Sequence, residues 1–199
     1  MLRKNEILLS EVMSMREFAA VRKERRRALI GTKRRRRIGV GPSATFFFEN
    51  YDTMWFQVHE MLFIEGGGDP QIQGELEAYN PLIPKGRELI ATLMFELDDP
   101  EERQQLLTRL EGVQKAISFM VGDQTVPGVV EEEVGEPRSD GKVSSVHFVH
   151  FPFLEEQIQA FFGNDCAILL RINHPAYQHH AILDTTIRSE LSKDFDIHS

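Results

Sequence analysis

The chain has 199 residues, of which 41% are hydrophobic and 27% charged, and its net charge is −8. This length suits one domain with its own core, and the composition is typical of a globular protein, not of a disordered or fibrous one. Cys166 is the only cysteine, which excludes an internal disulfide and any metal cluster that needs several cysteines of this chain. No run reaches the roughly 20 apolar residues of a membrane-spanning helix, so we expect a cytoplasmic protein.

Positive charge is concentrated in residues 22–37, which hold ten lysines and arginines and one glutamate. This segment has a net charge of +9 and leaves −17 for the rest of the chain. Successive arginines repel one another unless carboxylates or an anionic partner offset them. Pairing within the chain, pairing with a second copy and binding of an acidic partner or nucleic acid are the alternatives. The predicted anion- or partner-binding residues are Arg26, Arg34, Arg35, Arg36 and Arg37.

The first predicted element is a basic helix. Ser14 and Glu17 have the spacing of a capping box, which predicts a helix over residues 15–33. Residues 22–27 offer it nothing apolar to bury, so we expect its second half to be exposed or bound to a partner. A hairpin is predicted next, over residues 38–40 and 44–49, because turn-forming residues separate two β-prone runs.

Further elements follow along the chain. Asp52 is the predicted N-cap of a helix over residues 53–65, and Asp69 begins a short helix. Hydrophobic periodicity then predicts six strands and three helices. The strands are predicted at residues 87–97, 116–121, 126–130, 143–151, 167–172 and 177–183, and the helices at 99–110, 154–162 and 185–195.

This order of elements lacks a regular βαβ rhythm. It predicts a single α+β domain over residues 1–199, with a mostly antiparallel sheet of about six to eight strands covered by about five to six helices. Residues 1–13 are predicted to be flexible. Residues 131–142 are predicted to form an acidic, mobile loop.

The seven histidines match no local metal motif. His59 and Glu60 begin like a zinc-peptidase helix, but Phe63 stands where the second imidazole is needed. His147 and His150 have opposite parity on one strand, so we expect them on opposite faces. Imidazole and carboxylate together suit iron, manganese or zinc, which leaves a long-range site as a hypothesis. The candidate metal or cofactor residues are His59, Glu60, Glu75, His147 and His174, with Tyr79 and Asn80 in a loop near that site.

The alternative for these residues is structural. In that interpretation His147 hydrogen-bonds inside the sheet, His174 caps a turn and the two glutamates are solvated. Cys166 lies beside an apolar strand, where a thiol usually behaves as a small hydrophobic group.

Several patches of sequence carry a family resemblance. They are the basic run before Ile38-Gly39; Phe48-Glu49-Asn50 with Thr53, Gln57 and Glu60-Met61; Tyr79-Asn80-Pro81-Leu82-Ile83-Pro84; Ala91-Thr92-Leu93; Val146-His147-Phe148 with Phe151; and His174-Pro175 with Tyr177. Together they resemble the bacterial family catalogued as domain of unknown function 3501, over about residues 20–178. The resemblance brings no assigned catalytic residues. It implies a redox setting, with rubrerythrin-like and iron–sulfur or flavin oxidoreductases as expected partners.

Three hypotheses of function follow. The first is a cytoplasmic accessory protein of a redox or oxidative-stress system that binds a metal or cofactor. The second is a docking module that uses residues 22–37, and a homo-oligomer belongs to the same class. The third, a nucleotide or nucleic-acid binder, is ranked lower because the rest of the chain is acidic. Whether the protein is an enzyme stays open.

Overall fold

A computed structural model describes residues 4–131, 143–163 and 165–196. These ranges contain six α-helices and nine strands, and all neighbouring strands of the two sheets pair antiparallel. The predicted α+β class is confirmed, although the strands are divided between two sheets instead of forming one. Residues 132–142, most of the predicted acidic loop, lie outside the described ranges. No helix of the described residues has the length and apolar character needed to cross a membrane.

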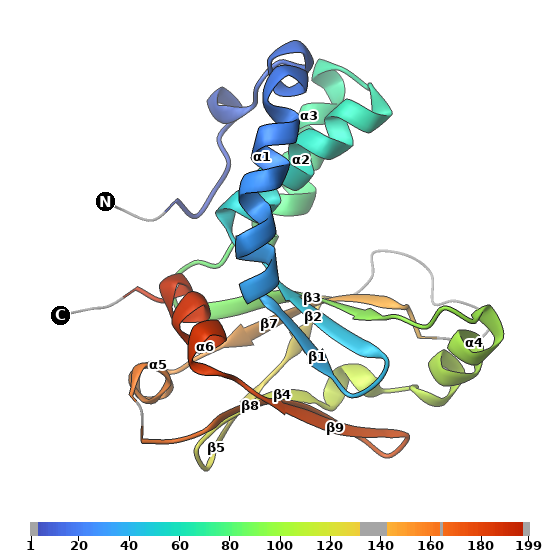
Figure 1. Cartoon of the computed structure of the whole chain (residues 1–199), viewed down its shortest axis with the longest axis vertical. Helices are drawn as coiled ribbons and strands as arrows, with labels where there is room; N and C mark the ends of the chain where they lie inside the picture. Colours follow the sequence, from blue (N-terminus) through green and yellow to red (C-terminus); the bar gives the residue numbers. More distant parts are fainter. Residues whose placement is uncertain (1–3, 132–142, 164, 197–199) are drawn as a thin grey trace.

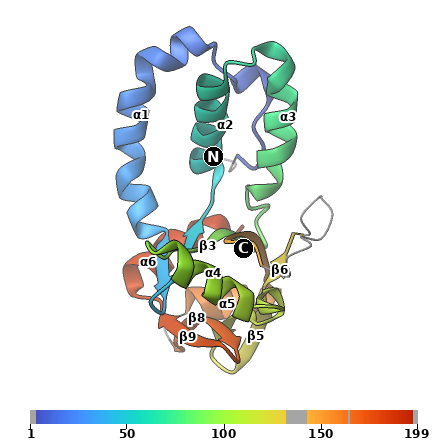
Figure 2. The same cartoon turned by 90° about the vertical axis from the view of Figure 1, so that its right-hand side faces the viewer.

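Three helices form an arm that stands away from the two sheets (Figures 1 and 2). They are α1 (Met15–Arg35), α2 (Tyr51–Glu65) and α3 (Asp69–Tyr79). Ser14 accepts the Glu17 N–H and Glu17 accepts the Ser14 N–H, so the predicted capping box is confirmed. The 3-10 turns η1 (Leu9–Glu11) and η2 (Asn80–Leu82) flank the arm.

The start of α2 differs from the prediction. The amide oxygen of Asn50 accepts the Thr53 N–H at 3.0 Å, and the Thr53 hydroxyl accepts the Asn50 N–H at 2.9 Å. Asn50 is therefore the N-cap, and the prediction of Asp52 was wrong. The helix begins two residues earlier than expected because this reciprocal pair satisfies its free amides.

The larger sheet has the strand order β1-β2-β3-β7-β6, and the smaller sheet has the order β5-β4-β8-β9. The larger sheet contains β1 (Arg37–Val40), β2 (Ala44–Phe48), β3 (Glu88–Phe95), β7 (Val146–Pro152) and β6 (Val129–Val130). The smaller sheet contains β5 (Gln124–Pro127), β4 (Ile117–Val121), β8 (Ile168–His174) and β9 (Tyr177–Ile182). The predicted hairpin is confirmed as β1 and β2, whose turn includes Gly41 at φ 73°.

The strand predicted over residues 126–130 is in fact two strands in different sheets. The chain crosses from one sheet to the other at Gly128, whose N–H donates to the Ile117 carbonyl at 2.9 Å. A Cβ atom at this position would lie 2.8 Å from Cγ1 of Val149. Only glycine allows the backbone to pass this closely.

Three short helices complete the fold: α4 (Pro100–Arg109), α5 (Glu155–Phe162) and α6 (Thr185–Leu191), with a 3-10 turn η3 (Val113–Lys115) after α4. The last helix is shorter than the predicted 185–195. It ends at Leu191, and the 3-10 turn η4 (Ser192–Asp194) follows. This turn brings Asp194 to the buried guanidinium of Arg36.

The molecule has two hydrophobic cores. The main core lies between the two sheets, and a second core lies between the arm and the outer face of the larger sheet. Strand β3 contributes to both, because Leu89 and Leu93 point into the main core and Ile90 into the second. The outer face of the larger sheet, beside the second core, is where the candidate site lies.

Candidate functional site

A cavity of about 530 Å³, here called the arm–sheet cavity, lies where the arm meets the outer face of the larger sheet. Its floor is a row of side chains on three neighbouring strands, because Phe47 pairs with Thr92 and Thr92 pairs with Phe148. Met54 and Leu82 close it from the arm. This volume is within the range of about 300–1,000 Å³ that is usual for small-molecule sites.

One carboxyl group, that of Glu49, lines this largely apolar space. Its side chain follows β2 and is only 9% exposed. It accepts hydrogen bonds from the hydroxyl of Thr53 at 2.7 Å and from that of Thr92 at 2.8 Å. Burial raises the pKa of Glu49, against the opposing effect of these two hydrogen bonds. A group of this kind in a cavity is a candidate for ligand recognition.

Four cationic side chains also line the cavity: Lys33 and Arg34 at the end of α1, the buried Arg36, and Arg37 at the start of β1. Arg37 lies 3.6 Å from a carboxylate oxygen of Glu96 and packs over the Phe47 ring at 5.5 Å. Arg34 is exposed and forms no salt bridge with another described residue. The cavity therefore combines apolar walls with positive charge.

The other two arginines of residues 34–37 are paired within the chain. Arg35 donates to Glu190 at 3.0 Å. Arg36 is buried, donates to Asp194, and also donates to the carbonyls of Phe48 and Glu49 at 2.9 Å each. The run thus divides, because α1 ends within it and the chain turns into β1.

The side chains of the two predicted loop residues make different contacts. Tyr79 lines the arm–sheet cavity, and burial raises the pKa of its hydroxyl while a hydrogen bond with Gln57 opposes this. The Asn80 amide accepts the Ile7 N–H at 2.8 Å and donates to the Ile7 carbonyl at 3.1 Å. Tyr79 is therefore placed at the site, whereas Asn80 anchors the N-terminal segment.

Two of the three candidate histidines, His59 and His174, are held by backbone groups. Nε2 of His59 accepts the Met13 N–H at 3.0 Å, so Nδ1 carries the proton and donates to the Trp55 carbonyl at 2.7 Å. Burial lowers the pKa of His59, which keeps the ring neutral. His174 contacts the Glu111 carbonyl at 2.9 Å through Nε2, and its Nδ1 accepts the Ala176 N–H.

The other three candidate metal residues have contacts of their own and do not join His59 or His174 in a common site. Glu60 accepts two hydrogen bonds from Arg22, at 2.6 and 2.8 Å, and Glu75 accepts one from Gln71 at 2.9 Å. His147 is on the inner face of β7, opposite in direction to His150 as predicted, with its ring 6.2 Å from that of Phe95. Among the described residues no group of three or more His, Cys, Asp and Glu side chains is arranged to hold a metal ion.

The sequence argument named Arg34, Arg36, Arg37 and Tyr79 but missed other residues that build the arm–sheet cavity. Glu49, Thr53, Gln57, Thr92 and Phe148 were absent from the candidate set, although each lies in a patch that carries the family resemblance. A second signal was the polar Thr92 in the middle of the apolar run of residues 89–95. These patches are far apart in the sequence, and the fold brings these five residues together at this cavity.

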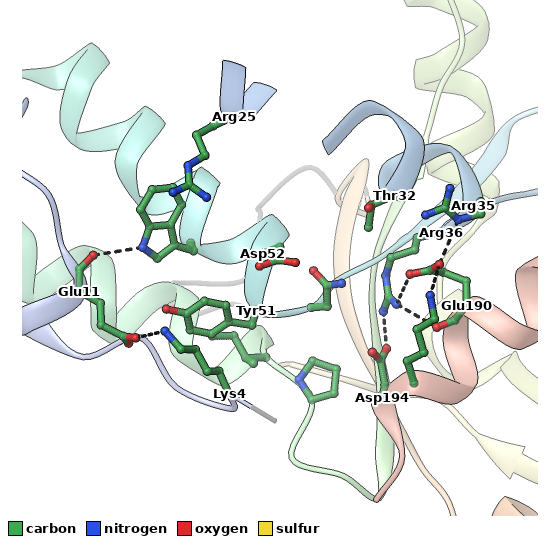
Figure 3. A pocket seen from close by; sticks show the side chains of 15 residues that line it. Lys4, Glu11, Arg25, Thr32, Arg35, Arg36, Tyr51, Asp52, Glu190 and Asp194 are labelled. Atoms are coloured by element: carbon green, nitrogen blue, oxygen red, sulfur yellow. Dashed lines mark hydrogen bonds and ion pairs between the residues drawn. The ribbon is translucent and has the colours of Figure 1, made fainter. Parts of the chain in front are cut away.

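A second, more polar cavity of about 730 Å³ lies on the other side of Arg36. Figure 3 shows Lys4 beside Glu11 at one side, and Arg35 and Arg36 facing Glu190 and Asp194 at the other. Burial alone would raise the pKa of Glu190, but hydrogen bonds from Lys193 and Arg35 lower it. These charges compensate each other within the chain. At this cavity, residues near both ends of the chain lie beside the arm.

Comparisons with known proteins agree with the resemblance seen in the sequence patches. The sequence model of a family described as "Protein of unknown function (DUF3501)" matches residues 6–195. The crystal structure of a novel protein of unknown function from Burkholderia pseudomallei K96243 is similar to this chain, with 30% identity and a TM-score of 0.87. The similarity covers 96% of this chain and 99% of that one. No curated protein gives a significant match.

Proposed function

Because the chain belongs to the DUF3501 family, whose description names no activity, we propose a function from the arm–sheet cavity itself: it binds a small amphipathic organic anion. The single observation that carries this proposal is an apolar cavity with cationic side chains and one buried carboxyl group. Each of the three features selects one part of the ligand.

The floor and walls select an apolar body. Phe47 and Phe148 present rings from β2 and β7, the strands on either side of β3, and Met94 lies on the same face of β3. Removing apolar ligand surface from water contributes about 25 cal/mol per Å². A flat or aliphatic hydrocarbon part of the ligand is therefore expected against this floor.

The cations select a negative charge. Arg34 forms no salt bridge with another described residue, so a ligand anion that approaches it displaces no carboxylate. Lys33 adds a second charge from the preceding position of α1. A hydrogen bond to a charged group contributes about 1.5–3 kcal/mol, more than one between neutral groups.

Glu49 selects a polar group at the inner part of the ligand. Its two carboxyl oxygens already accept from Thr53 and Thr92, and each oxygen can accept again or, when protonated, donate. A ligand that leaves this buried group without a partner loses affinity. The carboxyl group therefore favours ligands with a hydrogen-bonding group opposite the anionic end.

Two fluorescent probes with the same apolar body test the proposal. Anilinonaphthalene sulfonate carries an anion, and N-phenylnaphthylamine lacks it. We expect the sulfonate to bind more tightly to the wild-type protein. Replacement Arg34→Gln should weaken the sulfonate about tenfold, because it removes one charge-assisted contact of about 1.5 kcal/mol, and should leave the neutral probe unchanged.

Arg27→Gln is the matched control, since Arg27 is exposed on the same helix and lies outside the cavity. Equal affinity for the two probes, or the same response to both replacements, would refute the proposal. A phosphorylated flavin used as a competitor tests whether the ligand class includes an organic redox cofactor. The redox role implied by the family resemblance stays a prediction until such a competitor binds.

A further inference from the structure

A groove of about 400 Å³ runs between α1 and α2 on the arm. Leu29 and Ile30 line it from α1, and Phe56, Met61 and Ile64 line it from α2. Ile30 is 64% exposed and Ile64 is 68% exposed, an unusual state for large aliphatic side chains that share one groove. The apolar face of the arm is therefore incompletely covered by the chain itself.

Cations border this groove. Arg26 and Lys33 line it, and Arg27 is exposed on the same helix. The one carboxylate among the lining residues, Glu60, is held by two hydrogen bonds from Arg22. Neither Arg26 nor Arg27 forms a salt bridge with another described residue. The groove thus offers apolar contacts beside positive charges that form no salt bridge with another described residue.

These features select among possible occupants. A second copy that used the same face would place like cations against each other, because a two-fold interface pairs identical patches. A nucleic acid would gain little from the groove, since its single aromatic ring, Phe56, is buried and cannot stack on a base. An amphipathic helix fits both features, with apolar residues on one face and carboxylates along the edges of that face.

We propose that the α1–α2 groove docks an acidic amphipathic helix of a partner protein. The apolar face of that helix covers Ile30 and Ile64, and its carboxylates pair with Arg26 and Arg27. The argument for this surface does not rest on the ligand proposed for the arm–sheet cavity.

A labelled synthetic peptide of about 18 residues tests this surface, a length at which a helix can form. It carries leucines on one helical face and glutamates at the positions that flank this face, and its binding to the full chain is followed by fluorescence anisotropy. We expect micromolar affinity that falls as salt rises, because exposed charges are screened. Ile30→Gln and Arg26→Gln should each weaken binding about five- to tenfold.

Two matched replacements serve as controls. Ile182→Gln changes an isoleucine that is 66% exposed on β9, and Arg109→Gln changes an exposed arginine on α4. Both should leave the affinity within about twofold of wild type. A version of the peptide with lysines in place of glutamates should not bind.

Three results would overturn the proposal. These are no binding of the acidic peptide, equal binding of the lysine peptide, and equal effects of Ile30→Gln and Ile182→Gln. Displacement of the peptide by a single-stranded oligonucleotide of higher affinity would assign the surface to nucleic acid instead.

Discussion

Glu49 has its carboxyl group out of water, between the hydroxyls of Thr53 and Thr92. Because burial raises the pKa of this group, the folded protein holds a proton at a pH where the unfolded chain has released it. The unfolded value is about 4.3. Stability is therefore lost as the pH rises from that value through the folded pKa, which is the expected cost of keeping an acid at a ligand site.

The replacement Glu49→Gln tests this sign. Glutamine does not titrate and can still hydrogen-bond to both threonines. Relative to wild type, the variant should gain unfolding free energy as the pH rises from about 4 to about 8, by about 1.4 kcal/mol for each unit by which burial raises the pKa. Urea unfolding at several pH values measures the difference. Two parallel pH curves would contradict the proposed burial.

Single residues were the hardest part of the site to predict. Chemical type singled out His59 and His174, but each is held by backbone groups that sequence spacing does not reveal. Glu49 and Thr92 look ordinary in the sequence because they lie 43 residues apart and meet only through the register of β2 and β3. The hydrogen-bond partners of these side chains are set by the tertiary structure.

At the scale of elements, α1 is long and held by few apolar contacts. Phe18 is its one buried residue, packed against Phe56, His59 and other rings of α2. Near its middle Arg22 pairs with Glu60. A helix with so little buried surface depends on these contacts to stay against its neighbour.

Phe18→Ala should therefore destabilise the packing of α1 against α2 more than it destabilises the two sheets. Removing a buried phenylalanine costs about 3–5 kcal/mol. Hydrogen exchange should become faster in the amides of α1, with those of β3 staying protected. Leu8→Ala, at a residue that is 53% exposed, is the control. Uniformly faster exchange in all elements would show that the arm and sheets unfold as one unit.

Most elements could be predicted because their apolar residues repeat with a helical or strand period. The strand β4, predicted over residues 116–121, and the helix α5, predicted over residues 154–162, are examples. Boundaries set by particular contacts could not. The Asn50 cap depends on a reciprocal hydrogen bond, and the split at Gly128 depends on how closely Val149 approaches the backbone.

At the scale of the whole molecule, Lys33 lines both the arm–sheet cavity and the α1–α2 groove. One ammonium group cannot pair fully with a ligand anion and with a partner carboxylate at once. The two proposed binding events should therefore oppose each other, and at equilibrium each must weaken the other by the same factor.

The sulfonate probe and the acidic peptide can measure this opposition. We expect each to weaken the other about threefold in the wild-type protein, and Lys33→Gln to reduce this factor to nearly one. Opposition of unchanged size in Lys33→Gln would place the coupling elsewhere in the arm.

The buried contact between Arg36 and Asp194 joins residues that are 158 positions apart. Contacts of such long range form late, since a large loop must close before they can contribute. During synthesis the guanidinium that separates the two cavities has no acidic partner from η4 until residue 194 has left the ribosome. The walls of both cavities are therefore among the last parts of the protein to mature.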